Sequence, residues 1–157
     1  PYINDFDSLC LSSEGTLEYL RYCMRRVVEQ GFDGIDFEES EEAFWYCDCP
    51  DCKKTFWQGA STPEESLHNA NTFLLNELYH ELKNLKPDIT IGLRAWRQPP
   101  LVRDEKLLAT MVASIPSDVV LFWAPGHYVA DSEFDKWIQF FGRKIYIKQP
   151  IMVYPGK

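Results

Sequence analysis

Acidic side chains alternate with apolar ones in a short segment of the chain. Residues 32–38, with the sequence FDGIDFE, place an acidic or small residue at every second position. Such alternation is typical of a β-strand with one apolar and one polar face. Asp36 and Glu38 should therefore share the face opposite Ile35 and Phe37. The sequence predicts two carboxylates that point the same way at the end of one strand.

A pair of carboxylates has a definite chemistry. Glycoside hydrolysis generally uses two of them, one to donate a proton and the other to act as nucleophile or base. We expect Glu38 to be the general acid/base, with Glu39 or Asp36 assisting. The alternative is that Glu38 and Glu39 belong with Glu41 and Glu42 to a solvated acidic loop.

Further polar and aromatic residues fall where other predicted strands end. In α/β folds, ligands collect at the carboxyl ends of parallel strands, so these residues could line a binding site. Aromatic rings there suit the apolar faces of sugars, although a tryptophan such as Trp123 is more often part of the core. A lysine or arginine would pair with a carboxylate of the protein or of an acidic sugar. The candidate substrate-binding residues are Arg94, Trp96, Trp123, His127 and Lys148.

Cysteines form the most unusual local feature. The chain has five, an odd number, so they cannot all pair within it, and Cys47, Cys49 and Cys52 fall within six residues. Three thiols so spaced can converge on one zinc ion if Cys10 or His68 supplies a fourth ligand. A loop disulfide or reduced thiols is the alternative. We expect no cofactor to be required for catalysis, with a structural zinc as the one candidate.

Strands and helices must alternate to position these groups. Parallel pairing follows, because consecutive parallel strands are joined by right-handed helical crossovers. The fold class is α/β, either part of a (β/α)8 barrel or an open parallel sheet, and about 250 residues are usual for a complete barrel. We expect residues 1–157 to be a single α/β domain and a fragment of a larger barrel. The predicted strands cover 32–38, 89–96, 118–123 and 144–148, and the predicted helices 14–30, 62–85, 103–113 and 131–141. For the first helix we expect a hydroxyl cap from Ser12 or Ser13 and a stop at Gly31, and for the second a Thr62 cap with Pro63 at the first helical position.

Composition restricts the partners. The net charge of -8 would repel a phosphate backbone, so nucleic acid is disfavoured. No apolar run approaches the ~20 residues that cross a bilayer, so no membrane insertion is expected. A partial barrel would leave strand edges open, which predicts self-association through them or repacking as an open sheet. The sequence does not indicate a cellular location.

Three segments together resemble a known family. The runs LCLSSE at 9–14, GFDGIDFE at 31–38 and CDCPDC at 47–52 look like the middle of barrels related to glycoside hydrolase family 20 and α-glucuronidase-like proteins. The resemblance implies that 32–38 is the fourth barrel strand, and that Ile89, Val119 and Ile145 begin the fifth, sixth and seventh. Glu38 would then hold the position where such enzymes often carry the acid. Family 20 proper ends this strand in an Asp-Glu pair, whereas here Phe37 precedes Glu38.

Three hypotheses follow, in order of preference. The first is a carbohydrate-active hydrolase domain that cleaves glycosidic bonds. The second is a non-catalytic carbohydrate-binding or scaffold fragment. The third is a zinc-binding protein organised by the cysteine loop.

Overall fold

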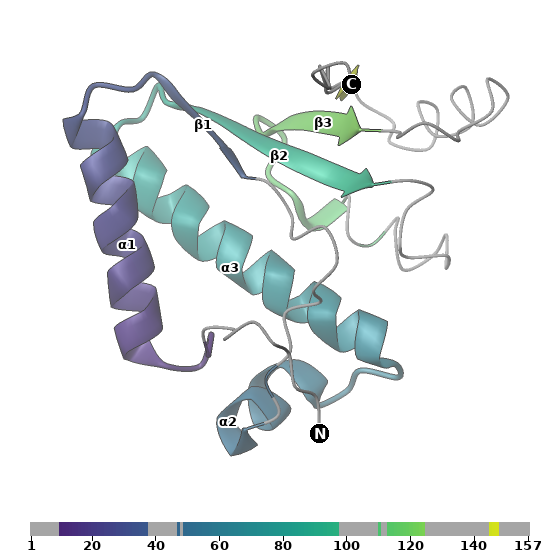
Figure 1. The fold of residues 1–157 in the computed structure, drawn as a ribbon. Coiled ribbons are helices and arrows are strands. Elements are labelled where there is room, and N and C mark those ends of the chain that lie inside the picture. The colour runs from purple at the N-terminus through teal and green to yellow at the C-terminus, as the bar shows by residue number, and fades with distance from the viewer. Residues whose placement is uncertain are drawn as a thin grey trace, which may run out of the picture.

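The computed structural model describes residues 10–37, 47, 49–97, 110, 113–124 and 145–147. Figure 1 shows two long helices packed beneath a sheet of strands. None of the described helices is both long enough and apolar enough to span a membrane.

Helix α1 (Glu14–Glu29) and strand β1 (Gly34–Phe37) form the first unit. Gly31 ends the helix as expected: its φ is +84°, a value that glycine adopts without strain, and its N–H donates to the Val28 carbonyl. The expected hydroxyl cap is wrong. Ser13 occupies the N-cap position but its side chain makes no capping hydrogen bond. The hydroxyl of Ser12 instead donates to the Cys52 sulfur.

A helical segment that the sequence did not predict precedes the second long helix. It comprises the single turn α2 (Pro50–Cys52) and the π-helical turn η1 (Lys53–Trp57). Helix α3 (Pro63–Leu85) follows. The Thr62 hydroxyl caps it by accepting a hydrogen bond from the N–H of Glu65, and Pro63 takes the first helical position, as predicted.

Four parallel strands make the sheet. After β1 come β2 (Thr90–Arg97), β3 (Val120–Ala124) and β4 (Ile145–Ile147), and the spatial order is β1-β2-β3-β4. Each strand therefore pairs with the next one along the chain, as in a barrel, without the order reversal of a doubly wound sheet. The α/β class with about four parallel strands is confirmed, and the arrangement is compatible with part of a barrel.

The structure describes one of the two remaining predicted helices in part and the other not at all. The described positions 110, 113 and 114 are helical, at the end of the helix expected over 103–113, and the helix expected over 131–141 lies outside the described residues.

Among the described strands, β1 and β4 each pair on one side alone, so this part of the sheet has two edges. Self-association through such edges stays a prediction.

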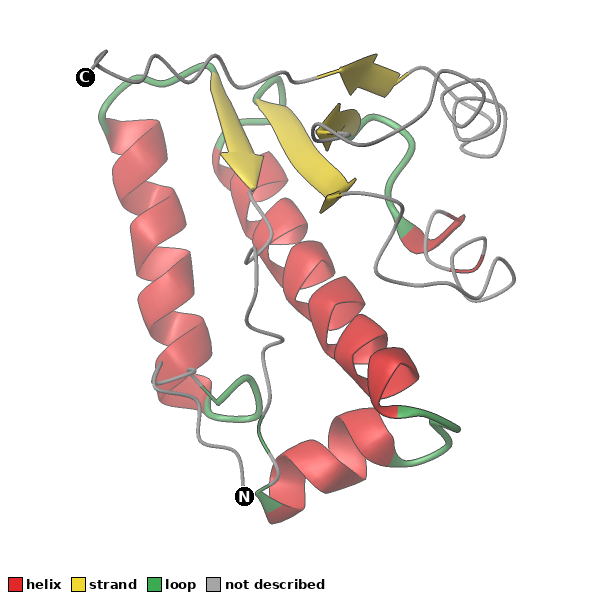
Figure 2. Cartoon of the chain, turned by 45° about the vertical axis from the view of Figure 1, so that its right-hand side comes forward, coloured by secondary structure: helices red, strands yellow, loops and turns green. Residues whose placement is uncertain are grey.

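The main core lies between the sheet and both long helices (Figure 2). Met24 from α1 and Leu78 and Leu82 from α3 pack against Ile91 of β2 and Leu121 of β3. Leu82 and Leu121 are fully buried. One face of the sheet thus rests on α1 and α3, and we call the opposite face the distal face.

Ion pairs join the two helices along their sides. Arg21 contacts Glu77 at 2.7 Å and Arg25 contacts Glu81 at 2.9 Å. Both partners in each helix are four residues apart, so the pairs lie one helical turn from each other. The two pairs form a ladder that joins successive turns of α1 and α3.

Candidate functional site

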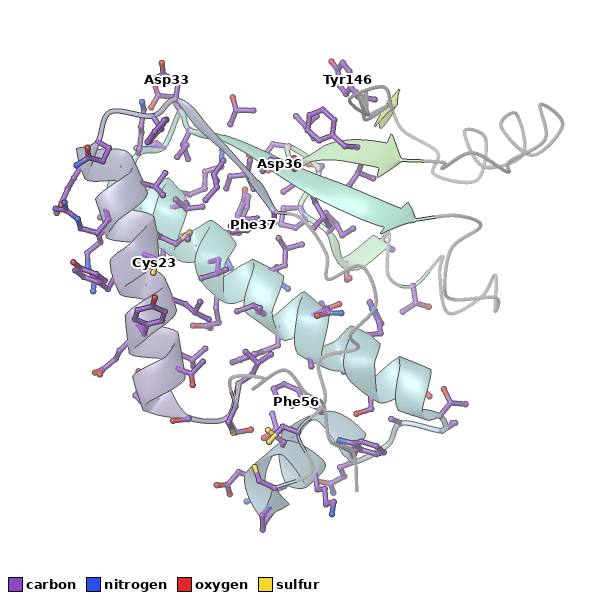
Figure 3. The ribbon with its side chains drawn as sticks, viewed as in Figure 1. Cys23, Asp33, Asp36, Phe37, Phe56 and Tyr146 are labelled. Carbon is purple, nitrogen blue, oxygen red and sulfur yellow. The ribbon has the colours of Figure 1, made fainter. Side chains whose placement is uncertain are left out.

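The carboxylate of Asp36 lies on the distal face, near the carboxyl end of β1. Its neighbours Ile35 and Phe37 pack against the main core, and Phe37 lies between β1 and α3 in Figure 3. Asp36 itself is exposed. The alternation expected of this strand is therefore confirmed for Asp36: its side chain points away from the helices.

Gly92 has no side chain, which leaves space for the Asp36 carboxylate. The two residues pair across β1 and β2. A Cβ atom on Gly92 would lie 3.1 Å from Oδ1 of Asp36 and 2.8 Å from Cε2 of Phe122. The second contact is shorter than any unstrained carbon–carbon approach. The absence of a side chain at Gly92 lets a carboxylate and an aromatic edge approach each other on the distal face.

Two aromatic rings continue this surface across β3 and β4. The ring centroids of Phe122 and Tyr146 lie 5.7 Å apart, with their planes tilted by 41°. Tyr146 is 43% exposed, and Figure 3 labels it together with Asp36. A carboxylate beside the half-buried Phe122 ring, with the exposed Tyr146 ring next to that, is a combination that binds sugars, because rings cover the apolar faces of sugars while polar groups hold the hydroxyls.

The other predicted site residues are placed only in part. Arg94 and Trp96 lie in β2 and Trp123 lies in β3; in backbone register Arg94 pairs with Phe122, and Trp123 pairs with Ile147. The principal catalytic candidates Glu38 and Glu39 lie outside the described residues, as do His127 and Lys148. Their roles stay predictions.

The cysteine cluster assembles from two distant segments. Cys10 precedes α1, whereas Cys47, Cys49 and Cys52 lie at and before α2, and all four sulfurs are within 4.8 Å of one another. Cys10 Sγ lies 3.5 Å from Cys52 Sγ and 3.7 Å from Cys49 Sγ. Of the two residues considered as a fourth partner, the structure thus brings Cys10 to the cluster.

His68, the other candidate, lies on α3 and is not part of the sulfur cluster. Its side chain is buried, and its Nε2 contacts the Thr72 hydroxyl at 3.3 Å. Its Nδ1 has no hydrogen-bond partner within the described part of the chain. Burial lowers the pKa of His68 to about 4, although Glu65 acts in the opposite direction.

The thiols of the cluster differ in their acidity. The pKa of Cys49 falls to about 7, mainly because the backbone N–H of Cys52 donates to its sulfur. Burial raises the pKa of Cys52 to about 12 and also raises that of Cys47. Without a cation, ionised sulfurs this close together would repel each other. The cluster is therefore suited to thiols that become ionised on binding a positive ion.

A second hydrophobic cluster surrounds the sulfurs. Its buried members are Leu11, Cys52, Phe56 and Ala70, and Phe56 and Phe73 approach with ring centroids 5.5 Å apart. The side-chain amide of Asn69 donates to the Phe56 carbonyl, which ties the end of η1 to α3. The cysteines thus pack against a small hydrophobic cluster that is separate from the main core.

Sequence reasoning missed the two features that shape the distal face. Gly92 lies within the predicted strand 89–96, but the approach that its small size permits depends on the strand register. The Phe122–Tyr146 pair was not singled out. Alternation along 118–123 and 144–148 could have placed both rings on one face once the strand order was known.

Comparison with known proteins identifies a solved structure with a similar fold. No family model and no curated protein sequence matches the chain. The solved structure of an O-GlcNAc hydrolase mutant of Thermobaculum terrenum is similar, with a TM-score of 0.69 and 18% sequence identity over 95% of this chain. The chain spans 31% of the length of that protein. The chain therefore shares the fold of the part of that protein that it matches.

Proposed function

We propose that this chain is part of a carbohydrate-active hydrolase whose sugar site lies on the distal face of the sheet. The observation that carries the proposal is the exposed Asp36 carboxylate at the carboxyl end of β1, beside Gly92 and the Phe122 edge. The sequential order of parallel strands supports it, because in barrels of this order the active site gathers at the carboxyl ends.

In this proposal the carboxylates share the work of cleaving a glycosidic bond. Glu38, two residues beyond Asp36, is the general acid/base, and Asp36 or Glu39 serves as the second carboxylate. The relationship to family 20 and α-glucuronidase-like barrels belongs to the same proposal. The similarity to an O-GlcNAc hydrolase makes N-acetylglucosaminides the first substrates to test.

Hydrolysis of aryl glycosides by the full-length protein tests this function. The panel contains N-acetylglucosaminides, glucosides and glucuronides, and the variants are Glu38→Gln and Asp36→Asn. Loss of a general acid/base should lower kcat by about 10²- to 10⁴-fold.

Asp33→Asn is the matched control. Asp33 directly precedes β1 at its amino end, where it pairs with Lys86. Its pKa is lowered by that lysine, which marks a structural ion pair. The control should retain wild-type kcat. An equal loss in Asp33→Asn, or full activity in Glu38→Gln, would refute the assignment.

A non-catalytic carbohydrate-binding module is the second candidate, favoured by the Phe122–Tyr146 pair with its exposed Tyr146 ring, which needs no acid to bind sugar. It predicts saturable sugar binding that is weakened by Tyr146→Ala, with no hydrolysis of any panel member.

A further inference from the structure

The cysteine cluster has no part in the proposed hydrolysis and needs its own explanation. None of the five cysteines forms a disulfide in the structure. The Cys10 sulfur lies 3.5 and 3.7 Å from the sulfurs of Cys52 and Cys49, whereas a disulfide would bring two sulfurs to about 2.05 Å. Four sulfurs gathered at non-bonded distances surround a point that a cation can occupy.

The size of the cluster matches one particular arrangement. Zinc binds thiolate sulfur at about 2.3 Å in a tetrahedron, which places neighbouring sulfurs about 3.8 Å apart. The separations in the cluster, all within 4.8 Å, suit one ion held by four sulfurs. An iron–sulfur cluster distributes its cysteines over different irons and would need them farther apart. We propose that Cys10, Cys47, Cys49 and Cys52 bind one structural Zn²⁺.

Groups around the sulfurs are arranged to support such an ion. The backbone N–H of Cys52 donates to Cys49 Sγ at 3.4 Å, and the Ser12 hydroxyl donates to Cys52 Sγ at 3.1 Å. Donors of this kind stabilise metal-bound thiolates and orient them. Cys52 is fully buried and packs with Leu11 and Phe56, whereas the other three cysteines are half-buried, so the Cys52 side of the site is shielded from solvent.

The ion would join two parts of the chain. Cys10 lies in the segment that leads into α1. Cys49 is the N-cap residue of the turn α2, which is followed by η1 and then by α3. Because the protein supplies all four ligands, no coordination position is left for substrate, which is the pattern of a structural site. The segment 38–46, which carries Glu38 and Glu39, runs between β1 and Cys47. The ion would therefore fix the position of Cys47, the residue that follows this segment in the sequence, whether or not the protein is a hydrolase.

Metal content of the full-length protein tests the inference directly. Protein produced with zinc in the medium should contain one zinc per chain, measured by mass spectrometry of the metal. Cys49→Ser should bind zinc at least about 100-fold more weakly, since loss of a ligand costs at least as much as loss of an outer-shell partner. Cys23→Ser is the matched control, because Cys23 packs against the main core and not with the other four. It should retain one zinc.

Cobalt substitution keeps the test decisive even if Cys49→Ser does not fold. Wild-type protein stripped of metal should bind one Co²⁺ and show the intense visible absorption of tetrahedral cobalt thiolate. Four thiols should become reactive when a chelator is added to the zinc-loaded protein.

Three outcomes would overturn the proposal: metal-free wild-type protein after growth with zinc, stoichiometric iron in place of zinc, or Cys23→Ser losing the ion together with Cys49→Ser.

Discussion

Gly92→Ala tests whether the distal face is as closely packed as the structure indicates. The new Cβ would lie 2.8 Å from Phe122 Cε2 and 3.1 Å from Asp36 Oδ1. Carbon atoms prefer separations of about 3.5 to 4.0 Å, so the ring must retreat by roughly 0.7 Å or more. The Tyr146 ring, 5.7 Å away between centroids, stands beside it.

The expected magnitude follows from two opposing effects. Overpacking by one methyl group costs about 1 to 3 kcal/mol. Alanine in a strand returns about 0.5 to 1 kcal/mol relative to glycine. The substitution should therefore lower the free energy of unfolding by about 1 kcal/mol, and by no more than about 2.5 kcal/mol. Hydrolysis or sugar binding should fall further than this loss of folded protein explains, because the Asp36 carboxylate is displaced as well.

Urea unfolding of four proteins measures the effect: wild type, Gly92→Ala, Phe122→Leu and the double variant. Phe122→Leu removes the ring atom that the new methyl group meets, so the double variant should recover about 1 kcal/mol as a coupling energy. Gly15→Ala is the matched glycine control. Only Ser13 Oγ, at 3.8 Å, approaches its Cβ position, so Gly15→Ala should not destabilise the protein, and because Gly15 lies in the first turn of α1 any gain should stay below about 1 kcal/mol. A Gly92→Ala variant that is more stable than the wild type, or an equal penalty with and without the Phe122 ring, would refute the reasoning.

Three further predictions concern stability. Leu82→Ala, in the fully buried core, should cost about 2 to 5 kcal/mol in urea unfolding, whereas Leu85→Ala, at a position 40% exposed, should cost well under half as much. Thr62→Ala removes the α3 cap and should cost about 1 kcal/mol, while Thr62→Ser should restore the wild-type midpoint. Because burial lowers the pKa of His68 to about 4, the unfolded chain binds more protons between pH 6.5 and 4, so stability should be complete above pH 6.5 and fall by up to about 3 kcal/mol toward pH 4. His68→Gln should remove this slope, and an unchanged slope would contradict the assignment.

Local signals in the sequence were sufficient for most of the fold. The Thr62-Pro63 start of α3 and the Gly31 stop of α1 are set by residues next to the helix ends, so they could be predicted. Strand alternation correctly placed Asp36 opposite Ile35 and Phe37. The turns α2 and η1 were missed because they are short and packed against α3 and the cysteines, which no local pattern encodes.

The site depended more on contacts between distant residues. The sequence left Cys10 and His68 equally available as a fourth partner, since distance along the chain says little about distance in space. The packing of Leu11 against Phe56 brings Cys10 to the cluster, and Ser12 turns its hydroxyl toward Cys52 instead of capping α1. The approach of Asp36 to Phe122 across Gly92 likewise required the register of three strands.

The ladder of Arg21–Glu77 and Arg25–Glu81 leads to an expectation about sequence variation among relatives. Exposed ion pairs contribute little free energy, typically under about 1 kcal/mol each. The spacing of the pairs instead favours one alignment of the two helices, because sliding α1 by one turn along α3 would leave one arginine and one glutamate without their partners. A reversed charge at position 25 would therefore be tolerated in a relative that also reverses position 81, whereas Arg21 also pairs with Glu14, which would have to change as well. Substitutions at these positions should occur as coupled pairs, with each pair inherited as a unit.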